Sequence, residues 1–140
     1  MHSNFDRNFT EHSKGDRPLV LVVDNDRDNL LLIGCVVESM GLNYVVTNES
    51  QQCLNLAEEL LPDIILLDIV MPKMSGLEIA IILKQSEQLS HIPLLAVTGL
   101  TKNKDRQKLI EAGFDDYLSK PYLIEELEAK LNKLLKDPLA

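Results

Sequence analysis

Short, uninterrupted apolar runs alternate along the chain with longer segments in which apolar residues recur every three or four positions. The short runs are rich in β-branched residues, which is typical of strands buried on both faces of a parallel sheet. Together with two shorter segments, they predict five strands: Leu19–Val23, Asn43–Thr47, Ile64–Leu67, Pro93–Val97 and a short strand that contains Tyr117 and Leu118.

The periodic segments between the strands predict five helices. They cover Arg27–Met40, Glu49–Leu60, Leu77–Glu87, a charged stretch from Thr101 to Ala112, and a final helix striped by Leu123, Leu127, Leu131 and Leu134/Leu135. Asp26 is placed to cap the first helix and Gly41 to end it. Strands and helices that alternate in this way indicate an α/β fold, with a parallel sheet and helices on both of its faces.

The beginning of the chain has a different composition. Residues 1–18 are polar and charged and include Gly15 and Pro18, so we expect a flexible N-terminal arm. Residues 19–137 then form one domain, because a chain of 140 residues has the size of a single compact unit. We expect no second domain after the last helix.

Composition excludes several classes of function. The net charge is −8, from 14 Lys+Arg against 22 Asp+Glu, which disfavours direct binding to nucleic acid or to an anionic membrane surface. No apolar stretch approaches the roughly 20 residues that a membrane span needs, and no signal peptide is evident. We therefore expect a cytoplasmic protein.

The two cysteines, Cys35 and Cys53, both lie among apolar residues of predicted helices. No C-x-x-C spacing is present and the three histidines are scattered, so a zinc site is not expected. We predict two buried, reduced thiols.

Polar residues follow four of the five predicted strands. The carboxyl ends of parallel strands meet at one edge of a sheet, where functional residues of α/β proteins collect. The residues at these ends are Asp24 and Asn25 after the first strand, Asp68 after the third, Thr98 after the fourth and Lys120 after the fifth.

This set of side chains suits phosphoryl chemistry. Oxygen atoms of Asp24, Asn25 and Asp68 are the donors that Mg²⁺ prefers. Asp68 could then act as a carboxylate nucleophile that forms an acyl phosphate. Lys120 could balance charge on the phosphoryl oxygens and Thr98 could donate a hydrogen bond to one of them. Each residue alone could simply end a strand or cap a helix, but their joint placement indicates a functional site.

Four segments in this order resemble the receiver (CheY-like) domain of two-component response regulators. They are Val22-Val23-Asp24-Asn25-Asp26, Leu66-Leu67-Asp68-Ile69-Val70-Met71-Pro72-Lys73-Met74-Ser75-Gly76, Ala96-Val97-Thr98-Gly99 and Asp116-Tyr117-Leu118-Ser119-Lys120-Pro121. The resemblance implies a flavodoxin-like (βα)5 fold with strand order 2-1-3-4-5. It covers Leu19 to about Lys136 and suggests a stand-alone receiver.

The resemblance also implies a function. A sensor histidine kinase or phosphotransfer protein would pass a phosphoryl group to Asp68 with the help of Mg²⁺, which the backbone carbonyl of Val70 would also ligate. Thr98 and Tyr117 would then remodel the face formed by the fourth helix, fifth strand and fifth helix, which a downstream protein reads. Such a domain is a phosphorylated signalling protein and not an enzyme in the usual sense.

Asn25 departs from the family pattern, in which two adjacent acids usually follow the first strand. The loss of one negative charge opens an alternative, a pseudo-receiver that binds a partner independently of phosphorylation. A Mg²⁺-dependent phosphohydrolase ranks last, because its second aspartate would stand where this chain has Val70. The apolar side chains of Val70 and Leu100 predict slow loss of the phosphoryl group, since neither can position a water molecule.

Overall fold

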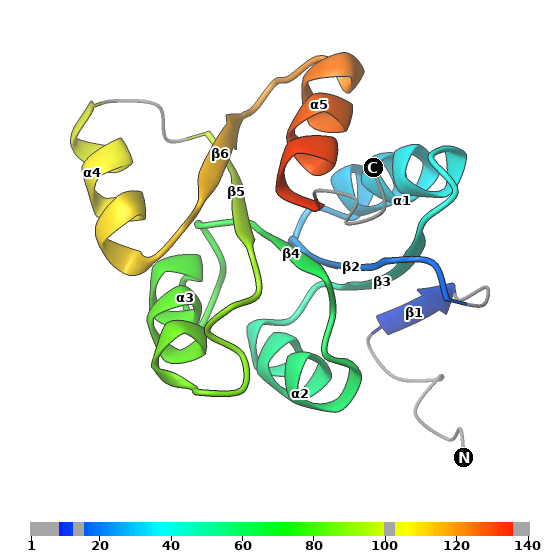
Figure 1. Ribbon diagram of the computed structural model, residues 1–140. Helices are drawn as coiled ribbons and strands as arrows, with labels where there is room; N and C mark the ends of the chain where they lie inside the picture. Colours follow the sequence, from blue (N-terminus) through cyan, green and yellow to red (C-terminus); the bar gives the residue numbers. More distant parts are fainter. Residues whose placement is uncertain (1–8, 13–15, 100–102, 136–140) are drawn as a thin grey trace.

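A computed structural model of the protein describes residues 9–12, 16–99 and 103–135. In these residues a six-stranded sheet is flanked by five helices (Figure 1). The strands are β1 (Phe9–His12), β2 (Leu19–Val23), β3 (Asn43–Thr47), β4 (Ile64–Leu67), β5 (Leu94–Thr98) and β6 (Asp116–Ser119). The helices are α1 (Arg27–Ser39), α2 (Ser50–Leu60), α3 (Gly76–Gln85), α4 (Asn103–Ala112) and α5 (Ile124–Leu135).

The strands lie in the order β1-β3-β2-β4-β5-β6. All neighbouring pairs from β3 to β6 are parallel, whereas β1 runs antiparallel to β3. Counted from β2, the parallel strands have the order 2-1-3-4-5, which confirms the predicted flavodoxin-like fold. The carboxyl ends of β2, β4, β5 and β6 therefore lie along one edge of the sheet.

Successive residues of a strand point to opposite sides of the sheet, so the apolar strands have two hydrophobic faces. Helices cover both of them. In β2, for example, Leu21 faces the core shared with α2, α3 and α4, while Val22 faces the core shared with α1 and α5. Figure 1 shows α1 and α5 together on one side and α2 and α3 on the other. Both faces of the central strands are apolar, as their continuous hydrophobic sequences predict.

Local signals in the sequence fix both ends of α1. The Asp26 side chain accepts a hydrogen bond from the backbone N–H of Asp28 at 3.0 Å, which confirms it as the N-cap of α1. Gly41 has φ +78° just after α1, as expected of a residue that ends a helix. No helix in the described residues is both long and apolar enough to cross a lipid bilayer.

Strand β1 corrects the expectation of a flexible arm over residues 1–18. Phe9 pairs with Thr47 and His12 with Tyr44, so four of these residues extend the sheet beyond β3. Sequence periodicity could not find this strand, because pairing on an exposed edge uses backbone groups and needs no apolar side-chain pattern. The rest of the predicted arm up to residue 15 lies outside the described residues.

Two further predictions are wrong in detail. Cys53 is buried, but Cys35 is exposed on the solvent side of α1, and neither forms a disulfide. Leu123 precedes α5 and is 66% exposed, whereas Leu127 and Leu131 of the same predicted stripe are buried. Cys35 lies outside the face of α1 that Leu30, Ile33 and Val37 turn to the sheet, and Leu123 lies one residue before α5 begins.

Candidate functional site

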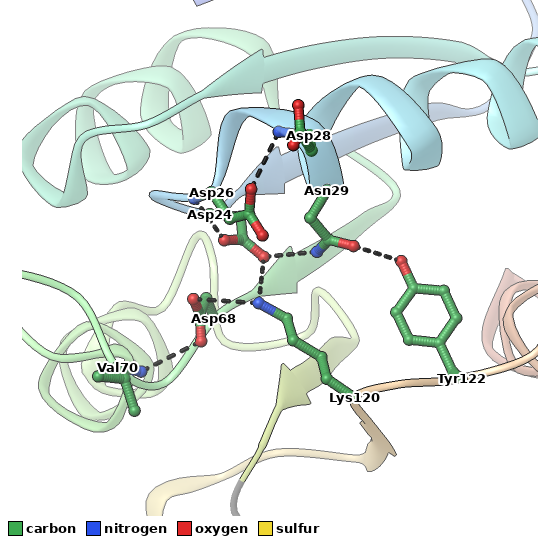
Figure 2. A network of polar contacts seen from close by, with 8 residues as sticks. All are labelled: Asp24, Asp26, Asp28, Asn29, Asp68, Val70, Lys120 and Tyr122. Carbon is green, nitrogen blue, oxygen red and sulfur yellow. Dashed lines mark hydrogen bonds and ion pairs between the residues drawn. The ribbon is translucent and has the colours of Figure 1, made fainter.

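The side chains of Asp24, Asp68 and Lys120 meet at the carboxyl edge of the sheet (Figure 2). Asp24 follows β2 and Asp68 follows β4, two strands that are hydrogen-bonded neighbours. Lys120 follows β6 and reaches back across the end of the sheet. Its Nζ donates to Oδ2 of Asp24 at 2.9 Å and lies 3.4 Å from Oδ2 of Asp68. The structure thus brings together three residues that the sequence predicted as a site.

Both carboxylates are almost completely buried, with 1% exposure for Asp24 and 5% for Asp68. Burial, together with repulsion from the Asp24 charge, raises the pKa of Asp68 to about 6. Lys120 and the backbone N–H of Val70, which donates to Oδ1 of Asp68 at 3.2 Å, oppose this rise without cancelling it. The two carboxylates therefore carry more negative charge than the single positive charge of Lys120 neutralises.

The surroundings of the two carboxylates also shift the pKa of Lys120. Burial lowers its pKa, but hydrogen bonding and attraction by Asp24, together with the charge of Asp68, outweigh burial and raise the pKa above its ordinary value. Lys120 is thus held protonated between the two carboxylates.

Gly76, the first residue of α3, lies close against the backbone of Asp68 and Ile69. The N–H of Gly76 donates to the carbonyl oxygen of Ile69 at 2.9 Å. A Cβ atom built on Gly76 would lie 2.4 Å from the carbonyl oxygen of Asp68 and 2.8 Å from Cα of Ile69. Only glycine fits here, because both of these contacts are to backbone atoms that cannot turn away.

The other predicted site residues differ in how deeply they are buried. Thr98 is the last residue of β5 and is fully buried. Asn25 is exposed and lines a cavity of about 510 Å³ together with residues of the loops after β3 and β4. Val70 is 63% exposed beside Asp68. Leu100, the other apolar residue predicted to shield the site, lies outside the described residues.

Tyr117 lies on β6 and is half-buried. Its ring is flanked by two cations: the guanidinium carbon of Arg106 lies 5.2 Å from the ring centroid and Nζ of Lys130 lies 5.7 Å from it. Lys130 also bonds Oδ1 of Asp116 at 2.9 Å. The predicted switch residue is therefore held between α4 and α5.

Two residues of the polar network were not predicted. The Asn29 side chain, on the first turn of α1, donates from Nδ2 to Oδ2 of Asp24 at 2.6 Å. Tyr122, two residues after Lys120, donates from its hydroxyl to Oδ1 of Asn29 at 2.6 Å. The available signal for Asn29 was an amide four residues before the inward-facing Ile33, on the same face of α1. Nothing in the sequence pattern singles out Tyr122.

The oxygen donors at this edge suit a hard cation. The described residues contain no group of three His, Cys, Asp or Glu side chains arranged to hold a metal. The buried carboxylates of Asp24 and Asp68 nevertheless both lie within reach of Lys120 and offer the oxygen atoms that a hard cation prefers. Mg²⁺ needs few protein oxygens because it keeps several waters, so these two carboxylates fit this ion.

Comparison with known proteins agrees with this geometry. The family described as "Response regulator receiver domain" matches residues 20–132. The polar-differentiation response regulator DivK of Brucella ovis is 34% identical over 118 residues, which cover 84% of this chain and 96% of that protein.

Solved structures of receiver domains share the fold of this chain. The receiver domain of the Francisella response regulator 1452 superposes with a TM-score of 0.79 at 30% identity, covering 85% of this chain and 97% of that one. The receiver domain of the sensor histidine kinase PA1611 from Pseudomonas aeruginosa, solved with a magnesium ion coordinated in its active-site cleft, gives a TM-score of 0.80 at 26% identity and covers 86% and 99%. Fold, residues at the strand ends and sequence similarity all agree, and the chain belongs to the response regulator receiver family of two-component signalling proteins.

Proposed function

We propose that this protein is a phosphoacceptor, which takes a phosphoryl group on Asp68 from the phosphohistidine of a sensor kinase or phosphotransfer protein. The observation that carries the proposal is the placement of the Asp68 carboxylate, 5% exposed, beside both Asp24 and the ammonium group of Lys120. A carboxylate confined at the end of a buried strand is positioned for attack on a donor that approaches from the open edge of the sheet.

In the proposed step, one carboxylate oxygen of Asp68 attacks the phosphorus atom. An O–P bond forms and the P–N bond of the donor breaks, and its electron pair returns to the imidazole nitrogen, which takes up a proton. Lys120 stabilises negative charge on the phosphoryl oxygens through a charge-assisted contact. The hydroxyl of Thr98, at the end of the adjacent strand β5, is the further donor we assign to one of these oxygens.

Asp24, Asn25, Asp68 and the backbone carbonyl of Val70 are the groups that would hold magnesium. When bound, the ion supplies positive charge that offsets the repulsion between the carboxylates and an incoming phosphoryl group. The chain itself contributes the anionic oxygens and keeps them in place through the bonds from Lys120 and from the backbone of Val70.

We further propose that phosphorylation is read by a downstream protein at the α4–β6–α5 face. Thr98 would follow the phosphoryl group, and Tyr117 would change its place between Arg106 and Lys130. This proposal draws on the position of Tyr117 in β6, directly beside β5 and therefore beside the strand that carries Thr98.

The proposed function is tested by incubating the protein with acetyl phosphate and Mg²⁺ and measuring its intact mass. We expect the mass of the wild-type protein to increase by one phosphoryl group and the mass of Asp68→Asn to stay unchanged. Asp28→Asn is the matched control, because it makes the same change at an exposed position of α1, and it should be phosphorylated like the wild type. Equal modification of wild type and Asp68→Asn would contradict the proposal.

A second prediction concerns Asn25. Asn25→Asp should bind Mg²⁺ about fivefold more tightly than the wild type, since a restored charge beside a partly buried cation contributes on the order of 1 kcal/mol. Titration with Mg²⁺ checks this. Asn48→Asp, which adds the same charge to the lining of the same cavity, serves as control and should bind Mg²⁺ with nearly wild-type affinity.

These variants also distinguish the alternative function. If the wild-type protein is a pseudo-receiver, acetyl phosphate and Mg²⁺ should leave it unmodified, whereas the Asn25→Asp variant should accept a phosphoryl group. Equal affinities of Asn25→Asp and wild type for Mg²⁺ would show that residue 25 does not contribute to the metal site.

A further inference from the structure

A continuous chain of hydrogen bonds leads from the start of α5 to the carboxylates. The hydroxyl of Tyr122 donates to Oδ1 of Asn29 at 2.6 Å, and Nδ2 of Asn29 donates to Oδ2 of Asp24 at 2.6 Å. Figure 2 shows the amide of Asn29 lying between the phenol and the carboxylate. Residues 93 positions apart in the sequence are thereby joined on the side of the site away from Asp68.

The phenol determines which way the amide faces. An Asn side chain has a donor end and an acceptor end, and Asp24 can use only the donor end when it is ionised. Burial and the negative charges of Asp24 and Asp26 raise the pKa of Tyr122 to about 12, so its hydroxyl keeps its proton and donates. Turning the amide over would bring its oxygen to the carboxylate and would break both short bonds.

The amide in turn fixes the orientation of Asp24. Oδ1 of Asp24 accepts the backbone N–H of Asp26 at 2.8 Å, whereas Oδ2 accepts both Asn29 and Lys120. In the described residues, Lys120 is the other side chain that donates to Oδ2 of Asp24. Lys120 also lies against Asp68, so without Asn29 the position of Oδ2 would depend on an ammonium group that two carboxylates share.

We propose that Asn29 and Tyr122 are positioning residues of the phosphoacceptor site. Tyr122 orients the amide of Asn29, and Asn29 holds the Asp24 carboxylate in the orientation that serves Lys120 and a bound cation. This inference rests on the proposed function of Asp68, but its first test does not require phosphorylation. Within the part of the chain that the structure describes, the hydrogen bonds of Tyr122 and Asn29 lead to Asp24 and not to Asp68, so both residues act through Asp24.

The first test is an NMR measurement on the metal-free protein. The side-chain amide protons of Asn29, identified by their loss in Asn29→Leu, should include one at low field that exchanges slowly with water. In Tyr122→Phe we expect this proton to move toward the position of a free amide and to exchange faster. Tyr44→Phe is the matched control: it removes a hydroxyl that is bonded to Glu38 on the same side of the sheet, and it should leave the Asn29 signal unchanged. An unchanged signal in Tyr122→Phe would overturn the proposal.

The second test measures phosphorylation by a small donor at saturating Mg²⁺. Asn29→Leu should lower the maximal rate by roughly tenfold, the lower end of the losses found when groups that orient metal ligands are removed. The half-saturating donor concentration should not change, because Asn29 does not touch the donor. Tyr122→Phe should lower the rate less, and adding it to Asn29→Leu should have no further effect.

The double variant Asn29→Leu/Tyr122→Phe tests whether the two residues act by the same route. Additive effects of the two substitutions, or a changed half-saturating donor concentration, would overturn the proposal, since Tyr122 would then act by a route other than Asn29. If the wild type itself takes no phosphoryl group, the proposed function of Asp68 fails, while the amide signal still decides whether Tyr122 orients Asn29.

Discussion

Asp68→Asn is expected to stabilise the folded protein at neutral pH by about 3 kcal/mol in the absence of Mg²⁺. Asp68 ionises with a pKa of about 6 in the folded protein against an ordinary value of 3.8, mainly because it is buried and lies beside Asp24. Each unit of such a shift corresponds to about 1.4 kcal/mol, and asparagine removes this cost while keeping the shape of the side chain. The residue proposed to carry the chemistry thus weakens the fold.

The gain should depend on pH in a defined direction. The folded state binds the Asp68 proton more tightly than the unfolded state, so wild-type stability falls as pH rises from about 3.8 to about 6. The difference between Asp68→Asn and wild type should be near zero below this window and constant above it. Urea denaturation of both proteins from acid to neutral pH measures this, and Asp28→Asn should show no such rise. A difference that is independent of pH would refute the electrostatic explanation.

Gly76→Ala is expected to destabilise the protein by about 3 kcal/mol and to impair phosphorylation of Asp68. The added methyl group would lie 2.4 Å from the carbonyl oxygen of Asp68, so the backbone of Asp68 and Ile69 must shift. Forced overpacking against main-chain atoms costs from one to several kcal/mol, and here the displaced segment carries the phosphoacceptor. Urea denaturation and the rate of phosphorylation by acetyl phosphate give the two measurements.

Gly99→Ala provides the control for this prediction. Gly99 follows Thr98 at the same edge of the sheet, but a Cβ atom there meets no heavy atom within 4 Å. Its effect on stability should stay within about 0.5 kcal/mol. Equal effects of the two substitutions would mean that close contact with the Asp68 backbone is not what requires glycine at position 76.

The sequence was sufficient for the parallel sheet and for the centre of the site. Each buried strand has a distinct apolar run, and parallel strands end at one edge, so residues such as Asp24, Asp68 and Lys120 could be placed together without coordinates. Asn29 and Tyr122 were missed for the opposite reason. Their contact depends on the rotation of α1 about its axis and on the path of the chain after β6, which no local pattern encodes.

The difference between the two thiols makes this receiver suitable for site-selective labelling. Burial raises the pKa of Cys53 to about 12, so its thiol is both inaccessible and protonated at neutral pH, whereas Cys35 is exposed. A maleimide dye should therefore attach to the native protein once, on α1, six positions after Asn29. Fluorescence from that dye would follow the helix that borders the carboxylates, with no engineered cysteine.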